Sequence, residues 1–320
     1  MAIAFPTLRL LISVSRQRGW RQIQRQAGEV RDLATLHAAK ERTPTLGGLG
    51  IWLATCTATL LYAPLQADVV ATLAIFSIFA AIGLADDGAK IFFHSSRGMA
   101  GKSRLICQGI AVLALFVCLS HWAPDSYHAL HRPCIPLPFR SSEFHLTTFF
   151  AAIFSFLVLA GSANGVNLTD GIDGLAAGCS LLTAIALAAI ALHGDAWPLS
   201  IPLLSLAGSL ATFLWFNAHP AQIFMGDTGA LAIGGLLGSA ALFLRQPFLL
   251  AIIGGVFVLE TVSVLLQVYY FKWTGGRRIF RMAPFHHHLE LGGWPETRIT
   301  VRLWLVTTVL ATAGLLLNRW

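Results

Sequence analysis

The sequence predicts an all-α integral membrane protein that crosses the bilayer with about ten transmembrane helices. Of the 320 residues, 56% are hydrophobic and only 12% are charged, whereas an ordinary soluble domain has about 25% charged residues. These charges are too few to cover the surface of a soluble enzyme of this size, and the apolar content excludes a disordered chain. No repeat or soluble segment interrupts the pattern, so we expect a single polytopic domain over residues 1–320.

Nine apolar stretches have about the length that a helix needs to cross a bilayer, which is about 20 residues. They are residues 46–63, 69–85, 104–122, 145–163, 174–192, 197–216, 229–245, 247–270 and 300–318. A tenth stretch, Met1 to Val14, contains Pro6 and Arg9 and is too short to cross alone without thinning the bilayer. We therefore expect a short or truncated first helix. The proline-rich connector over residues 123–144 is expected to be irregular.

The basic residues predict which side of the membrane each loop faces. The formal net charge is +7, but the basic residues lie between the apolar stretches and form no basic stripe, so no nucleic-acid partner is expected. If residues 15–45 are cytoplasmic, the loops on that side hold 17 of the 22 Lys and Arg residues. This asymmetry follows the positive-inside rule. The five cysteines form no CxxC pair, so no disulfide framework or zinc site is expected.

Five aspartates lie at the predicted cytoplasmic ends of the apolar stretches or in the loops after them. They are Asp86, Asp87, Asp170, Asp173 and Asp227. The adjacent carboxylates of Asp86 and Asp87 repel each other unless a cation balances them, and a divalent metal is a natural partner. A solvated helix end is the alternative, but acids there oppose the helix dipole. The sequence therefore predicts one water-facing site, an active-site cleft on the cytoplasmic face.

Two polar stretches contain further candidate binding residues. Residues 164–175 gather amides, carboxylates and glycines, including Asn164 and Asn167. Glycines let a ligand approach the backbone, and Asn and Asp can pair with a base or sugar, although a tight polar turn uses the same residues. In the second stretch, Asn217 to Gly229, Phe224 could stack on a nucleobase and Asp227 could hold Mg²⁺. A hydrophobic anchor for the loop is the alternative for Phe224.

Cationic residues that suit phosphate lie in two other places. His286, His287 and His288 follow several arginines in a loop that prolines bound, and histidines can both attract and hydrogen-bond phosphate. A transition-metal tract or a solvated loop is the alternative. Lys40 precedes the first long apolar stretch and offers another cationic contact. Glu260, an acid inside an apolar stretch, is interpreted as a structural hydrogen-bonding group.

Metal-binding acids, cations, a stacking aromatic and glycine-rich turns on one membrane face are the parts expected for phosphoryl transfer from a nucleotide to a lipid. From about Gly28 to the C-terminus, the motifs resemble those of the polyprenyl-phosphate N-acetylhexosamine-1-phosphate transferases. Within this superfamily they look most like the phospho-N-acetylmuramoyl-pentapeptide transferases, because Met282-Ala283-Pro284 stands shortly before the three histidines and Gly293-Trp294-Pro295-Glu296 follows them. The resemblance implies a bacterial inner-membrane protein with ten transmembrane helices and a cytoplasmic cleft, often a homodimer.

The resemblance also implies an activity and roles for individual residues. The expected reaction moves phospho-MurNAc-pentapeptide from UDP-MurNAc-pentapeptide to undecaprenyl phosphate, a membrane lipid, and yields lipid I and UMP with Mg²⁺ as cofactor. The residues implied in catalysis are Asp86, Asp87, Asp227 and His286, with Asp87 and Asp227 as metal ligands. Those implied in substrate binding are Lys40, Asn164, Asn167, Asp170, Asp173, Asn217, Phe224, His287 and His288.

Three alternatives remain open from the sequence. The nearest is the same chemistry with UDP-N-acetylglucosamine as the donor. A membrane transporter is a second alternative, but transporters bind substrate near the middle of the bilayer, whereas these acids lie at one interface. A catalytically silent relative of the transferases is the third.

Overall fold

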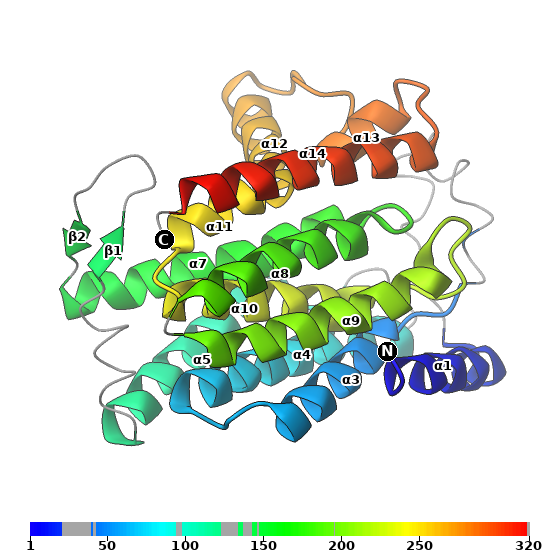
Figure 1. The fold of residues 1–320 in the computed structure, drawn as a ribbon. Coiled ribbons are helices and arrows are strands. Elements are labelled where there is room, and N and C mark those ends of the chain that lie inside the picture. Colours follow the sequence, from blue (N-terminus) through cyan, green and yellow to red (C-terminus); the bar gives the residue numbers. More distant parts are fainter. Residues whose placement is uncertain are drawn as a thin grey trace.

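The computed structural model describes residues 1–20, 40, 43–93, 98–122, 134–136, 143–145, 147–194 and 196–318. In this part of the chain, long helices run side by side in one bundle (Figure 1). Eight of them are long and apolar enough to cross a membrane. They are α4 (Ala67–Phe92), α5 (Gly101–Trp122), α7 (Thr148–Thr169), α8 (Leu175–His193), α9 (Ser200–Asn217) with the preceding turn Trp197–Leu199, α10 (Gly226–Phe243), α12 (Gly255–Trp273) and α14 (Glu296–Leu317). The prediction of an all-α multi-pass membrane fold is confirmed.

Two helices near the N-terminus are shorter. The first, α1 (Ala4–Arg18), has 15 residues and is about 22 Å long at 1.5 Å per residue, which is less than the hydrocarbon core. The next, α3 (Gly47–Tyr62), has 16 residues. Helix α1 packs on α3 and α9, where Leu8 is fully buried. The expectation of a short first helix agrees with this structure.

The apolar stretch 247–270 is not one continuous helix, contrary to the prediction. It breaks at Gly254 into α11 (Pro247–Ile253) and α12. The hydropathy of the stretch does not indicate the break. Gly254 and Gly255 lower the free-energy cost of interrupting the helix there, because glycine adopts non-helical backbone conformations easily. The segment lies close to α14: a Cβ on Gly255 would lie 2.7 Å from Leu310, so only a glycine allows this approach without repacking.

Several polar residues that were expected at the ends of apolar stretches or in the loops after them belong to helices. Helix α4 continues seven residues beyond the predicted end and includes Asp86 and Asp87, and α7 continues to include Asn164 and Asn167. The histidines form a short helix, α13 (Phe285–Glu290). The apolar pattern stops where the polar residues begin, but hydrogen bonding along the backbone does not depend on hydropathy. The functional residues therefore have helical spacing on fixed supports.

A small antiparallel sheet lies at the end of the bundle opposite α1 and α13 (Figure 1). Its strands are β1 (Cys134–Pro136) and β2 (Glu143–His145), with Ile135 opposite Phe144. The expectation of an irregular connector over 123–144 is wrong for these strands. The rest of that connector lies outside the described residues.

Helix α10 forms the centre of the bundle, where it contacts α3, α4, α7, α8, α9 and α11. Every residue from Thr228 to Phe243 is buried. Small residues permit this close packing: a Cβ on Gly235 would lie 2.8 Å from the ring of Phe79 in α4, and a Cβ on Gly229 would lie 2.8 Å from the backbone of Gly48 in α3. The first turn of α10 is therefore held firmly beside the last turns of α4.

Candidate active site

Three aspartates meet where the end of α4 touches the start of α10. One carboxylate oxygen from each of Asp86, Asp87 and Asp227 lies within 4.8 Å of the others. The two helices come this close because Gly83 has no side chain: a Cβ there would lie 2.5 Å from the backbone nitrogen of Thr228. The side chains of Asp86 and Asp87 are buried, and that of Asp227 is 15% exposed. Asp227 thus offers the most accessible carboxylate of the cluster.

Asp87 caps the N-terminus of α10. Its Oδ1 accepts a hydrogen bond of 3.1 Å from the backbone N–H of Asp227, and its Oδ2 accepts bonds of 2.9 and 2.7 Å from the N–H and hydroxyl of Thr228. Gly226 makes room for this contact with a φ of +72°, and a Cβ on it would lie 2.6 Å from Asp87 Oδ2. A negative charge at a helix N-terminus is stabilised by the free N–H groups.

Two basic side chains balance part of the negative charge. The ammonium of Lys90 lies 2.5 Å from Asp86 Oδ2, 2.7 Å from Asp227 Oδ2 and 3.8 Å from Asp87 Oδ1. The guanidinium of Arg104, in the first turn of α5, lies 3.2 Å from Asp227 and 3.6 Å from Asp86. Two cations face three carboxylates, so the cluster retains the capacity to bind a further cation.

The two asparagines of α7 differ in their partners. Asn167 donates a hydrogen bond of 2.6 Å to Asp227 Oδ1 and accepts one of 3.0 Å from Arg104. Asn164, almost one turn earlier, donates to Gln108 of α5 at 3.1 Å and to the carbonyl of Ala160 at 2.7 Å. Asn167 therefore belongs to the aspartate cluster. The amide N–H groups of Asn164 instead bond α7 to α5 and to the preceding turn of α7 itself.

A second charged group surrounds Asp173. The ammonium of Lys40 donates hydrogen bonds of 2.8 Å to Asp173 and 2.6 Å to Glu296, at the start of α14. The other oxygen of Asp173 lies 3.0 Å from His219 Nδ1 and accepts a bond from the N–H of Ala221. The ligand atoms of Asp173, His219 and Glu296 also lie within 4.8 Å of one another, and the ammonium of Lys40 already lies between the two carboxylates and balances one of their two charges.

Asn217 is the last residue of α9, and Phe224 lies in the loop after it, which is tied to neighbouring segments. Asn217 is buried, accepts a hydrogen bond of 3.1 Å from the N–H of Gly174 and donates one of 2.9 Å to the carbonyl of Ile223. The backbone N–H of Phe224 bonds to Pro44 at 2.8 Å, and its carbonyl accepts from Gly47 at 2.9 Å. Asn217 thus holds two turns together, and the half-buried Phe224 side chain is attached to a fixed backbone.

Asp170 lies just after α7 and interacts electrostatically with both charged groups. The pKa of Asp170 is raised to about 7. Burial is the largest cause, and the negative charges of Asp227, Asp87 and Asp173 raise the pKa further. Lys40 acts in the opposite direction. A carboxylate with this pKa exchanges its proton near neutral pH.

The three histidines have different environments. His286 is fully buried, and its Nδ1 lies 3.2 Å from Glu260 of α12. His287 Nδ1 pairs with Glu290 at 2.6 Å. The Nδ1 of His288 accepts a hydrogen bond of 3.1 Å from the N–H of Arg281. His286 contacts the turn after α7, because a Cβ on Gly171 would collide with its ring.

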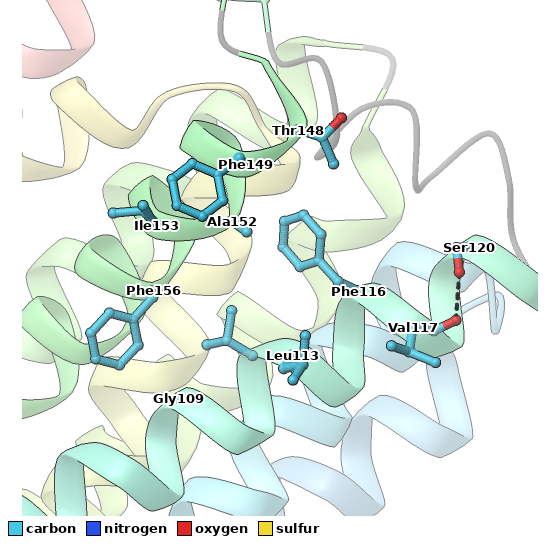
Figure 2. Close-up of a pocket in the computed structure, with 11 residues that line it drawn as sticks. Gly109, Leu113, Phe116, Val117, Ser120, Thr148, Phe149, Ala152, Ile153 and Phe156 are labelled. Carbon is cyan, nitrogen blue, oxygen red and sulfur yellow. Dashed lines mark hydrogen bonds between the residues drawn. The ribbon is translucent and has the colours of Figure 1, made fainter.

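A further hollow lies away from these charges, between α5 and α7 (Figure 2). It has a volume of about 610 Å³ and an apolar lining except for two hydroxyls. Phe116 of α5 and Phe149 and Phe156 of α7 line it, and the Ser120 hydroxyl is bonded to the carbonyl of Val117. This groove suits a hydrocarbon chain, and the residues that line it include no charged side chain that would bind a phosphate.

The structure brings together most of the residues expected at the site. It also places there four residues that were not predicted from the sequence. They are Lys90, Arg104, His219 and Glu296. Lys90 could have been found, because a lysine four residues after Asp86 shares its helix face. The other three come from separate helices and loops, and nothing in their local sequence indicates their partners.

Comparison with known proteins now identifies the family. Residues 69–245 match the model of glycosyl transferase family 4. The chain belongs to this family. One relative is a phospho-N-acetylmuramoyl-pentapeptide-transferase of Rickettsia felis, which is 41% identical to this chain over 312 residues. The aligned region covers 92% of this chain and 85% of the relative. The protein of the same name from Rickettsia prowazekii is 40% identical and covers 98% of the chain and 89% of the relative. Family 4 membership confirms the prediction of a membrane transferase and disfavours the transporter.

Proposed function

We propose that the protein transfers phospho-MurNAc-pentapeptide from UDP-MurNAc-pentapeptide to undecaprenyl phosphate and thereby forms lipid I and UMP. The observation that carries the proposal is the cluster of Asp86, Asp87 and Asp227 with two basic side chains at one end of a membrane bundle. The similarity to relatives with the corresponding name supports this choice of substrates. UDP-N-acetylglucosamine as the donor remains the rival that an experiment has to exclude.

The reaction is a phosphoryl transfer. An oxygen of the lipid phosphate attacks the phosphorus bonded to the sugar, a new P–O bond forms, and the bond from that phosphorus to the bridging oxygen breaks so that UMP leaves. One carboxylate of the Asp86–Asp87 pair accepts the proton of the lipid phosphate. Lys90 and Arg104 lie where they can turn from the carboxylates to the phosphate oxygens and balance their charge.

The aspartate cluster fits a magnesium ion, because carboxylate oxygens are the ligands this ion prefers. We propose Asp227 and Asp87 as the ligands. When bound, Mg²⁺ supplies positive charge that neutralises the diphosphate and stabilises the leaving UMP. Asn167 orients Asp227 through its hydrogen bond of 2.6 Å, and the cap by Asp87 holds the same aspartate at the start of α10.

The nucleotide is proposed to bind between the aspartate cluster and the Asp173 group, where Phe224 offers a ring for stacking. The residues proposed to line this region are Lys40, Asn164, Asn167, Asp170, Asp173, Asn217 and Phe224. The donor diphosphate would lie nearer the histidines of α13, with His286 in catalysis and His287 and His288 in binding.

The acceptor lipid needs an apolar surface for its hydrocarbon chain. Helices α5 and α7 provide one in the groove of Figure 2, and the same two helices contribute Arg104 and Asn167 to the aspartate cluster. A prenyl chain along this groove would leave its phosphate at the charged end. Larger side chains at Gly109 would obstruct it.

The cytoplasmic membrane of a bacterium is the proposed location, with the site facing the cytoplasm where the soluble UDP donor is present. The basic loops favour this orientation. A homodimer is proposed from the resemblance to the family alone.

A donor comparison tests the proposed function. Purified protein with Mg²⁺ and undecaprenyl phosphate is given UDP-MurNAc-pentapeptide or UDP-N-acetylglucosamine, and the lipid-linked product is measured. We expect product from the first donor and little or none from the second, with the Asp227→Ala variant as the inactive control. Transfer from the smaller donor alone would overturn the proposed substrate and leave the chemistry in place.

A further inference from the structure

Glu260 is a buried carboxylate inside a helix that crosses the membrane. It is 0% exposed in α12, and its Oε2 accepts a hydrogen bond of 3.3 Å from the backbone N–H of His286. Its Oε1 has no hydrogen-bond partner within the described part of the chain. Burying such a group is costly in a protein interior and more so in a bilayer. An apolar residue would be the cheaper choice for a position that only fills space.

His286 places its imidazole ring beside this carboxylate. It is 0% exposed, and its Nδ1 lies 3.2 Å from Glu260 Oε2. Neither ring nitrogen has a hydrogen-bond partner in the described structure, so the contact of Nδ1 with Glu260 is a close approach of the ring to the carboxylate. Nε2, on the opposite side of the ring, faces Gly171, where any Cβ would collide with it. The ring therefore spans from the carboxylate in α12 to the turn that carries Asp170 and Asp173.

A carboxylate beside one nitrogen of a histidine acts on the other nitrogen. It holds a proton on the near nitrogen, fixes the plane of the ring, and stabilises the positive charge that appears when the far nitrogen is also protonated. Here the near nitrogen is Nδ1 and the far one is Nε2. The far nitrogen is the one directed at the proposed substrate region.

We propose that Glu260 is the positioning residue of His286: it keeps Nδ1 protonated and holds Nε2 toward the Asp170–Gly174 turn for contact with the anionic donor. This inference rests on the proposed function, in which His286 acts on the donor. It differs from a purely structural link, in which Glu260 would only anchor the backbone of α13 to α12.

The variants Glu260→Gln and Glu260→Asp separate these two roles. Glutamine keeps an oxygen that can accept from the His286 backbone N–H, but has no negative charge to act on the ring. Aspartate keeps the charge on a shorter side chain. Ser263→Ala is the matched control, because Ser263 is also buried in α12 and its hydroxyl donates to the backbone carbonyl of Glu260, away from the His286 ring.

We expect Glu260→Gln to lower kcat by about 10- to 100-fold, as for other residues that orient a functional histidine. The KM for undecaprenyl phosphate should stay near its original value. Glu260→Asp should restore part of kcat, and Ser263→Ala should retain it. In an His286→Ala background, Glu260→Gln should cause no further loss, because the group through which it acts is gone. Independent, multiplying losses would overturn the proposal.

A spectroscopic measurement tests the same point without turnover. In the full-length protein labelled with ¹⁵N-histidine, the signals of His286 are those missing from the His286→Asn spectrum. We expect a protonated Nδ1 in the original protein and a loss of this preference in Glu260→Gln. If the protein fails to use the proposed donor but the spectra change as expected, the function is wrong and the pairing stands. Identical ring signals in both proteins would show that Glu260 does not position the ring.

Discussion

The backbone N–H and the hydroxyl of Thr228 both donate hydrogen bonds to one oxygen of Asp87, at 2.9 and 2.7 Å. This contact joins a helix that ends in charged residues to the first turn of the most buried helix in the bundle. It decides where the neighbouring residue Asp227 stands relative to Asp86. The carboxylate that caps α10 therefore also sets the geometry of the candidate metal site.

Asp87→Asn is expected to reduce both turnover and stability. The amide cannot accept all three hydrogen bonds that the carboxylate accepts, and an unsatisfied buried group costs about 1–3 kcal/mol. Turnover and the apparent Tm of the purified protein measure the two effects. Asp68→Asn at the opposite end of α4 is the control, because within the described part of the chain Asp68 accepts a hydrogen bond from the neighbouring N–H of Val69 alone. A fully stable and active Asp87→Asn variant would contradict the capping role.

Asp227→Ala is expected to abolish turnover while the protein stays folded and inserted. The variant loses the most exposed carboxylate of the cluster, so the charge of the diphosphate is left uncompensated. Lys90 keeps a partner in Asp86 at 2.5 Å, which protects the fold. Product formation is followed across a Mg²⁺ titration, with size-exclusion chromatography as the check on folding. A near-normal rate at ordinary Mg²⁺ would exclude Asp227 as a ligand.

Phe224→Ala is expected to weaken binding of the UDP donor by about 5- to 150-fold, since a stacked base is worth about 1–3 kcal/mol in nucleic-acid sites. Binding of undecaprenyl phosphate should change little. The backbone bonds from Phe224 to Pro44 and Gly47 do not involve the ring, so the loop should persist. Dissociation constants for both substrates are compared with those of Phe224→Tyr, which keeps a ring. Equal losses for both substrates would indicate that the loop has collapsed.

Asp170 predicts a pH dependence of stability. Its pKa is raised from the usual 3.8 to about 7, first by burial and then by neighbouring carboxylates. Between these values the folded protein holds a proton that the unfolded chain has lost, so this group favours folding less and less as the pH rises from about 4 to 7. Asp170→Asn should therefore raise the apparent Tm relative to the original protein at pH 8 more than at pH 5. A gain that does not depend on pH would contradict the assigned pKa.

The sequence alone predicts the helical membrane fold and the meeting of distant acids at one face, because hydropathy and charge asymmetry are local signals. The positions of Asp86, Asp87 and Asp227 follow from which end of each apolar stretch they occupy. The partners of these residues do not follow in the same way. Arg104 could be counted only as a loop charge until the packing of α5 against α7 and α4 placed its guanidinium beside Asp227.

Contacts that tertiary packing creates could not be predicted from the sequence for a different reason. Glu260 and His286 are 26 residues apart, and they meet because α13 folds back onto α12. Gly254 breaks a stretch whose hydropathy is uniform, because the neighbouring glycine allows close approach to α14. Neither event changes the local composition, so no window along the chain could indicate it.

The glycine- and alanine-rich surface of α10 makes the reacting centre rigid. Every residue from Thr228 to Phe243 is buried, and close glycine contacts join the helix to α3, α4 and α7. Asp227 stands at the start of this helix, which is enclosed on all sides and has no free space in which to shift. A donor as large as a nucleotide-linked sugar peptide would therefore have to fit the carboxylates where they stand, because the helix that carries Asp227 cannot move to admit it.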